Sequence, residues 1–382
     1  MDRMLKVNPL PVLTWNKQKI NSAELIWPEG LAAGVGPAGT ELPETVRFSM
    51  LEDAEAWYAE HGLKYEMEAV VACKYACAAD QSFPTGMGGG VDALLKECGA
   101  AARLYEIDGR GVSLRFDYRY ADGDARMDSA IFHLKPGSEA TVIEYYTAEP
   151  GSGFAGSVAR AWVEEGASLR LIRLQMLPEA FVFADDLGAR LEKDAKMEYT
   201  SMQLGSRRLY AGAYFDQWGE ASEVDSGMAY LAPSGSFVDY NYVDCFRGKD
   251  TKGTMRFHGV MEEKSEKNAR ETLDFRKGCT GAFGDEEEDI LAMGDDVVNK
   301  AIPMILGEEE DMSGRHAVTV GKLSPEMLYY MQSRGITRKT AEEMMIRSRI
   351  GQVSRRIPDP ALSKAVEEYL DTLFGASADA AE

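Results

Sequence analysis

Between about Arg103 and Ile305, apolar and polar residues partly alternate within segments of five to ten residues. These segments are rich in β-branched and aromatic side chains, which fit a pleated strand better than a helix. They include VSLRFDYRY, ATVIEYYT, SLRLIRLQML, KMEYTSMQL and FVDYNYV. No long helical pattern intervenes, so a doubly wound fold of alternating strands and helices is disfavoured. The central part of the chain is therefore predicted to be mainly β.

Short corners of small and polar residues introduce these segments. The first three corners recur about 28 to 29 residues apart, and the later ones lie closer together. Turns of a β-sandwich usually recur about every 8 to 12 residues, whereas one coil of a solenoid takes about 20 to 30 residues. The spacing therefore favours a β-solenoid, with a sandwich as the alternative. The corners are Pro136 to Ala140, Glu165 to Ala167, Lys193 to Ala195, Trp218 to Ala221 and Ser234 to Ser236.

Beyond about residue 322 the apolar residues recur with helical spacing. Ser324 and Thr337 are favourable N-cap residues, and Pro358 and Pro360 interrupt the helical pattern. The three predicted helices cover Pro325 to Gln332, Ala341 to Arg356 and Leu362 to Phe374.

The first hundred residues predict a small mixed or helical region. Leu51 to His61 is expected to form a short helix, and a second helix is expected from Val91. Tyr65 to Ala78 is Ala-rich and compatible with either a helix or a buried strand. Gly86 to Gly90 is interpreted as a flexible connector, because it lacks the Gly-Lys-Ser/Thr ending of a phosphate-binding loop.

These patterns divide the chain into four parts. The predicted parts are an N-terminal mixed or helical region (1–100), a β-solenoid core (101–322), a C-terminal helical domain (323–374) and a disordered tail (375–382).

Composition narrows the class of protein. The chain has 382 residues, of which 45% are apolar, and its formal net charge is −21. Such an acidic chain is repelled by nucleic acid and by anionic membranes, so neither is expected as a partner. Five cysteines, an odd number, argue against a disulfide framework. Together with the lack of a signal-peptide pattern, this predicts a cytoplasmic protein.

Several residues could carry chemistry. Cys73 and Cys77 have i, i+4 spacing, which could serve a metal site, but no second Cys or His pair lies nearby. Small side chains packed in the core are therefore the favoured interpretation. The pairs Asp185-Asp186 and Asp295-Asp296 and the acidic run 285–289 could supply acid/base carboxylates. Adjacent residues of a strand point to opposite faces, however, which makes such pairs poor dyads. Solvated corners are therefore predicted.

His316 is the sharpest single candidate. It lies where the strand pattern changes to the helical one, just after the acidic run Glu308 to Asp311. A neutral imidazole binds iron or zinc, and nearby carboxylates could complete a site. The alternative is a histidine with a structural role, whose ring forms a hydrogen bond with a backbone carbonyl at the end of a strand.

The stretch HAVTVGKLSPEMLYYMQSRGIT resembles the C-terminal signature of the SufB/SufD family of iron–sulfur cluster assembly scaffolds. The segments LPVLTWNKQKIN and PGSEATVIEYY are also similar to SufD-type sequence. The resemblance covers most of residues 100–373. The matching signature residues are His316, Thr319, Val320, Gly321, Leu328, Tyr329, Ser333, Arg334, Gly335 and Ile336.

The resemblance implies a right-handed parallel β-helix capped by helical segments. It implies a non-ATPase scaffold that docks a SufC-type ABC ATPase on about residues 325–373. A second SufB/SufD-type scaffold would pair through the C-terminal end of the β-helix. A transient iron–sulfur cluster would form at that subunit interface, with His316 as a ligand and reduced flavin (FAD) as a companion of the complex. This chain itself is not expected to bind a nucleotide.

Departures from the family pattern limit the sulfur chemistry. The family's cysteine two residues before the histidine is Gly314 here, and the upstream cysteine of B-type members falls at Glu288 when counted without gaps. A cysteine motif near the N-terminus of some B-type members is also absent. The chain is thus expected to be SufD-like or a divergent SufB-like member. Glu288 and His316 would offer oxygen and nitrogen ligands to a metal, and persulfide sulfur would come from a partner.

Two other hypotheses belong to different classes of protein. One is a β-helical carbohydrate-active enzyme that uses paired carboxylates, and the other is a structural spacer in which the stretch around His316 only caps the solenoid.

Overall fold

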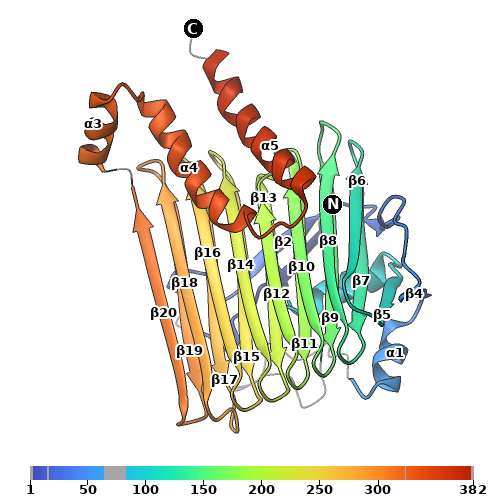
Figure 1. Cartoon of the computed structure of the whole chain (residues 1–382). Helices are drawn as coiled ribbons and strands as arrows, with labels where there is room; N and C mark the ends of the chain where they lie inside the picture. Colours follow the sequence, from blue (N-terminus) through green and yellow to red (C-terminus); the bar gives the residue numbers. More distant parts are fainter. Residues whose placement is uncertain (1–2, 15–16, 64–82, 323, 380–382) are drawn as a thin grey trace.

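The computed structural model describes residues 3–14, 17–63, 83–322 and 324–379, and it is dominated by two large sheets (Figure 1). Strands β5 to β20 alternate between the sheets, so each strand pairs in parallel with the strand two positions later. Each pair of consecutive strands is one coil of a solenoid. The predicted parallel β-solenoid is confirmed, and the sandwich alternative is wrong.

The eight-stranded sheet contains the even-numbered strands in the order β20 to β6. They are β6 (Val112–Tyr120), β8 (Glu139–Ala148), β10 (Ser168–Met176), β12 (Lys196–Gln203), β14 (Glu223–Ala232), β16 (Lys252–Met261), β18 (Ala282–Ala292) and β20 (Met312–Gly321). The ten-stranded sheet contains β3 (Ala32–Ala33), β4 (Val46–Leu51), β5 (Ala102–Ile107), β7 (Ala125–Leu134), β9 (Gly153–Val163), β11 (Phe181–Leu191), β13 (Arg208–Gln217), β15 (Phe237–Phe246), β17 (Glu266–Phe275) and β19 (Val298–Gly307).

The corners predicted from the sequence join consecutive strands and stack on one another. The amide of Gly137 donates to the carbonyl of Glu165, and the amide of Gly166 donates to the carbonyl of Lys193, both at 2.9 Å. Gly137 and Gly166 have φ angles of 70° and 65°, a left-handed conformation that glycine adopts without a steric penalty. The corner spacing of the sequence is thus the length of one coil.

The space between the two sheets is filled by stacked side chains. Tyr118 and Tyr146 stack with ring centroids 4.7 Å apart, and Phe246 and Phe275 stack at 4.4 Å. Each fully buried large side chain contributes roughly 1.5–3 kcal/mol relative to exposure. Repetition of such layers along the solenoid gives one continuous core.

The N-terminal region covers the outer face of the ten-stranded sheet. It contains β1 (Arg3–Val7), β2 (Ala23–Trp27), α1 (Ala54–Glu60) and α2 (Gly89–Glu97). Leu25 and Trp27 of β2 and Val91 of α2 pack against Val158 and Tyr210 of the sheet. The helix predicted at Leu51 to His61 corresponds to α1, and the helix expected from Val91 corresponds to α2. The segment predicted at Tyr65 to Ala78 lies outside the described residues.

N-terminal segments also cover the first coil of the solenoid. In the ten-stranded sheet, β4 pairs with β5 in an antiparallel register. At the edge of the eight-stranded sheet, the amide of Ala38 donates to the carbonyl of Asp117, and the hydroxyl of Thr40 donates to the carbonyl of Arg115. The first coil is therefore partly closed by the chain itself.

The glycine run at 86–90 is a close contact and not a flexible connector. The amide of Gly86 donates to the carbonyl of Leu187, and its own carbonyl accepts from Asn241 at 2.7 Å. A Cβ atom on Gly86 would lie 2.0 Å from the amide nitrogen of Ala213. Gly89 and Gly90 form the start of α2. The glycines are needed because two backbones meet here without space for a side chain.

The C-terminal helices are α3 (Pro325–Ser333), α4 (Arg338–Ser354) and α5 (Pro360–Asp379). Ser324 and Thr337 cap α3 and α4, each accepting a hydrogen bond from a backbone amide of the first turn. Helices α4 and α5 lie across the outer face of the eight-stranded sheet (Figure 1). The buried residues of this interface include Ile172, Leu174, Ala229 and Val260 of the sheet, Ile346, Ile350 and Val353 of α4, and Leu362, Val366 and Leu370 of α5.

The tail predicted as disordered at 375–382 begins inside α5, which continues to Asp379. Alanine is the best helix former, and the segment GASAD extends the helix rather than ending it. Residues 380–382 lie outside the described part of the chain.

Candidate functional site

The last two strands, β19 and β20, form an open end of the solenoid. Each pairs on one side with the preceding strand of its sheet, β17 or β18, and it is the terminal strand of that sheet. In Figure 1, β20 forms the edge of the eight-stranded sheet opposite β6. The backbone groups and interior-facing side chains of this end have no further coil above them within the described residues.

His316 points toward the interior at this open end. A Cβ atom added to Gly314 would lie 3.0 Å from Phe275 and 3.1 Å from Ile305, so position 314 faces the core between the sheets. Side chains of a strand alternate between faces. His316 and Val318 therefore face the same side as position 314.

Apolar side chains that belong to the interior are exposed there. Val318 and Val320 are 41% and 53% exposed, and Ile305 of β19 is 36% exposed. In a complete coil such residues would be covered by the next pair of strands, as Ile290 of β18 is covered by β20. The open end therefore combines an unpaired strand edge with an apolar surface.

Three carboxylates lie in the interior behind His316. Glu271, Glu286 and Glu288 are at most 2% exposed. Glu288 forms an ion pair with the buried ammonium of Lys267 and accepts a hydrogen bond of 2.6 Å from the hydroxyl of Tyr240. Within the described part of the chain, Glu271 and Glu286 form no ion pair, so Lys267 is the cation paired with this group of carboxylates.

The register of the last two even strands separates Glu288 from His316. Glu286 lies opposite His316, and Glu288 lies opposite Val318. Glu286 Oε1 is buried without a hydrogen-bond partner. The structure thus places Glu288 one layer further along the strand than His316, and it places Glu286, which the sequence did not single out, next to the histidine.

Burial dominates the titration of these carboxylates. Desolvation, with the repulsion of Glu288 second, raises the pKa of Glu286 to about 8. The same two effects hold the pKa of Glu271 well above its ordinary value. Both groups therefore favour the protonated form near neutral pH.

No group of three or more His, Cys, Asp or Glu residues with metal-binding geometry occurs in the described part of the chain. The pair Cys73 and Cys77 lies outside that part.

The thiols that the structure describes are poorly suited to sulfur chemistry. Cys245 is fully buried, and desolvation holds its pKa well above the ordinary value. Cys279 is also buried, with its pKa raised to about 11. The thiolate is the reactive form of cysteine, so both are expected to be inert.

The acidic pairs do not form solvated corners throughout. Asp185 and Asp186 are buried in β11, on opposite faces of the strand. Asp185 pairs with Arg173 in the interior, and Asp186 accepts a hydrogen bond from the amide of Met87 on the outer face. The acidic run 285–289 lies in β18, with Glu286 and Glu288 pointing inward. The prediction of solvated corners was wrong for Asp185, Asp186, Glu286 and Glu288, because they lie in strands that other elements cover, which local sequence does not reveal.

Asp295 and Asp296 are in the loop after β18, where their amides donate to Glu263. The side chain of Asp295 is fully exposed and pairs with Lys322. This pair is a solvated corner, as predicted.

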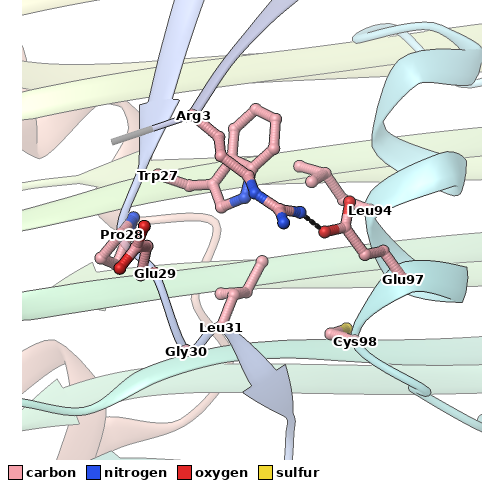
Figure 2. A pocket seen from close by; sticks show the side chains of 9 residues that line it. All are labelled: Arg3, Trp27, Pro28, Glu29, Gly30, Leu31, Leu94, Glu97 and Cys98. Carbon is pink, nitrogen blue, oxygen red and sulfur yellow. Dashed lines mark ion pairs between the residues drawn. The ribbon is translucent and has the colours of Figure 1, made fainter. Parts of the chain in front are cut away.

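A separate hollow of about 260 Å³ lies between β1, β2 and α2, far from His316 in the sequence (Figure 2). Trp27 and Leu94 form its apolar wall, and an ion pair between Arg3 and Glu97 crosses it. The thiol of Cys98 at its edge donates to the carbonyl of Leu95, and burial raises its pKa. The hollow contains no constellation of catalytic side chains.

No helix within the described residues is both long enough and apolar enough to cross a membrane.

Comparison with known proteins shows the family of the chain. Residues 118–349 match the family model described as "SUF system FeS cluster assembly, SufBD core domain". The iron–sulfur cluster assembly protein SufD of Bacillus subtilis is 21% identical over 252 residues, which cover 64% of this chain and 58% of that protein. SufB of the same organism is 25% identical over 167 residues, or 44% of this chain and 36% of that protein.

A SufBD family protein of Mycobacterium tuberculosis is 22% identical over 223 residues, covering 55% of this chain and 56% of that protein. The chain thus spans between about a third and three fifths of the length of these relatives. The family match itself covers most of the solenoid and the first half of the C-terminal helices. The chain belongs to the SufBD family of iron–sulfur cluster assembly proteins.

Proposed function

We propose that this chain is a non-ATPase scaffold subunit of a Suf-type complex that assembles and transfers iron–sulfur clusters. The observation that carries the proposal is the open end of the solenoid, where His316 lies beside exposed interior residues within the segment that matches the family. A protein that worked alone would be expected to cover this apolar surface.

The second scaffold subunit would pair through β19 and β20. Their outer edges offer unpaired backbone groups, and Val318, Val320 and Ile305 offer apolar contact area. Addition of strands from another SufB/SufD-type chain would satisfy both. The same open end would accept a second copy of this chain or a different scaffold.

The ATPase partner would dock on residues 325–373. Helix α3 has no buried residue, and Tyr329 and Tyr330 on it are 76% and 56% exposed. Exposed aromatic residues are typical anchors of protein interfaces. The inner faces of α4 and α5 are occupied by the sheet, so α3 and the outer faces of α4 and α5 would contact a SufC-type ABC ATPase.

The cluster would form at the paired open ends, with His316 as a ligand. Glu288 was the predicted oxygen ligand, but one of its carboxylate oxygens is already held by Lys267 and by the hydroxyl of Tyr240. Its ion pair with Lys267 would first have to open. Sulfur would arrive from a partner, and reduced flavin would act in the complex without a site on this chain.

The carbohydrate-active alternative gains no support from the geometry. It required two carboxylates facing one open groove, whereas Asp185 and Asp186 are buried on opposite faces of β11.

Co-purification tests the proposal. The full chain, tagged in its native host, is expected to retain an ABC-type ATPase and a scaffold chain, and anaerobic preparations are expected to contain iron and sulfide. Removal of residues 325–382 should abolish ATPase retention. A chain that purifies alone, from cells in which its loss leaves iron–sulfur enzyme activities unchanged, would refute the function.

A further inference from the structure

The carboxylate closest to His316 along the sheet is Glu286, not Glu288. We propose that Glu286 is the oxygen ligand that shares a divalent iron ion with His316. The inference rests on the proposed function for the identity of the metal, and it rests on the strand register for the identity of the ligand.

The register places the two side chains on one face. Glu286 and His316 are direct partners in the parallel pairing of β18 and β20. Neighbouring strands lie about 4.8 Å apart, and paired residues of parallel strands point to the same side. A carboxylate and an imidazole at this spacing can bind one ion between them. Glu288 is instead opposite Val318, two residues further along both strands.

The hydrogen bonds also distinguish the two carboxylates. Oε1 of Glu288 is held by Lys267 and by the hydroxyl of Tyr240. A metal ion there would have to displace a buried ammonium group. Each carboxylate also has one buried oxygen without a hydrogen-bond partner, Oε1 of Glu286 and Oε2 of Glu288, but of the two it is Glu288 that is paired with a cation. An unpaired buried polar group is expensive unless a ligand completes it.

The surroundings of Glu286 favour a cation. Three buried carboxylates share the positive charge of Lys267, which is paired with Glu288. The hydroxyl of Tyr230 is fully buried beside Glu271 and Glu288 and also lacks a hydrogen-bond partner. In the last coils of the solenoid, Glu271, Glu286, Glu288 and Tyr230 thus each have a buried side-chain oxygen without a hydrogen-bond partner.

One nitrogen and one oxygen ligand suit ferrous iron, but they fill only part of its coordination sphere. The remaining positions face the open end, because His316 is exposed there. A partner chain seated on β19 and β20 could complete the site with its own side chains or with sulfide. The affinity for the metal ion is thus expected to be low in the isolated chain and high in the paired complex.

The test uses anaerobic titration of the full chain, isolated with its partners, with Co²⁺ as an absorbing substitute for Fe²⁺ and then with Fe²⁺ alone. Glu286→Gln and His316→Ala are each expected to weaken Co²⁺ binding at least about tenfold. Loss of a residue that only supports a metal ligand already lowers metal affinity roughly 10- to 100-fold, and loss of a ligand should cost no less. Glu288→Gln and Glu287→Gln should change it less than about threefold. Glu287 is a matched control, because it lies between the two on the outward face of the same strand and is half exposed.

Circular dichroism and the midpoint of thermal unfolding establish that each variant is folded, and Glu286→Asp provides a second variant that keeps the charge but shortens the side chain. Loss of Co²⁺ binding in Glu288→Gln with retention in Glu286→Gln would overturn the assignment, as would equal binding by all variants or no binding by the unmodified complex. These outcomes differ from failure of the proposed function, which is measured separately by co-purified partners and by iron–sulfur enzyme activities in cells.

Discussion

Arg270 and Asp239 form an ion pair in which both side chains are fully buried, on the face of the ten-stranded sheet that the N-terminal region covers. Two guanidinium nitrogens of Arg270 donate to the two carboxylate oxygens, at 2.7 and 3.1 Å. A third nitrogen donates to the carbonyl of Ile20 at 2.6 Å. The pair therefore attaches the N-terminal region to the solenoid.

Replacing Arg270 by methionine is expected to lower the free energy of unfolding by about 3–5 kcal/mol, because the change leaves an uncompensated buried carboxylate. Urea unfolding measures this loss, and faster hydrogen exchange around Ile20 would show where attachment fails. Arg256→Met is the control, since its ion pair with Asp285 is about a quarter exposed and should contribute less than about 1 kcal/mol. Equal effects of the two substitutions would contradict the role assigned to Arg270.

Substitution by alanine at two glycines should change the stability of the protein in opposite directions. Gly86→Ala should destabilise the protein, because the new Cβ would lie 2.0 Å from a backbone nitrogen of β13. Gly351→Ala should stabilise it by about 0.5–1 kcal/mol, because Gly351 lies within α4 with open space around its Cα. Thermal unfolding of both variants under identical conditions checks the sign of each change.

The buried carboxyl of Asp186 makes stability dependent on pH. Desolvation raises its pKa to about 7 in the folded protein, compared with about 3.9 in an unfolded chain. The folded state therefore binds more protons between these values, and the free energy of unfolding is expected to fall as pH rises from about 4 to about 7.

Asp186→Asn removes this titration and retains an oxygen that can accept from the amide of Met87. The variant should lose less stability than the wild type between about pH 5 and pH 7, the upper part of the range between the two pKa values. Urea midpoints at the two pH values test the expectation. A steeper decline in Asp186→Asn would show that its carboxyl does not control this slope.

If the open end is the scaffold interface, the effect of a new charge on pairing should depend on which face of β20 carries it. Val318→Glu places a charge on the apolar, inward side of β20 and should abolish association with a second scaffold chain, as measured by light scattering after size-exclusion chromatography. Thr319→Glu introduces the same charge on the opposite face of the same strand and should leave pairing largely intact. Pairing that survives Val318→Glu would place the scaffold interface elsewhere.

Helix α3 allows a cleaner test of ATPase docking than a deletion. Removing residues 325–382 also uncovers the apolar face of the eight-stranded sheet, so loss of binding could follow from misfolding. Tyr329→Ala combined with Tyr330→Ala leaves α4 and α5 in place and should reduce co-purified ATPase by about tenfold or more, the loss of two exposed aromatic anchors. Lys196→Ala, an exposed change on the solenoid, should have no effect.

The sequence was informative where structure follows from local rules. The spacing of Gly137 and Gly166 predicted one coil, because each corner needs a residue suited to a left-handed turn and each coil has nearly the same length. Ser324 and Thr337 predicted the starts of α3 and α4, because capping depends on neighbours only three residues away. The resemblance around His316 gave the family.

The sequence failed where structure depends on pairing between distant segments. The count without gaps that selected Glu288 could not use the register of the whole solenoid, which puts Glu286 opposite His316; the assignment of Glu288 as a ligand stays a prediction. Asp185 and Asp186 resembled a solvated corner, because their partners Arg173 and the amide of Met87 lie in other elements. The run GDEEEDIL has no apolar–polar alternation across its five acidic residues, so local sequence did not separate the inward Glu286 and Glu288 from their outward neighbours.

The two ends of the solenoid are not equivalent. N-terminal segments cover the first coil through β4 and through Ala38, while β19 and β20 leave the last coil bare. A rod with two bare ends could add subunits without limit and grow into a fibre. If two chains pair bare end to bare end, as proposed, each would supply the other's missing coil and the assembly would close as a pair. The different structures of the two ends would then limit the number of subunits to two.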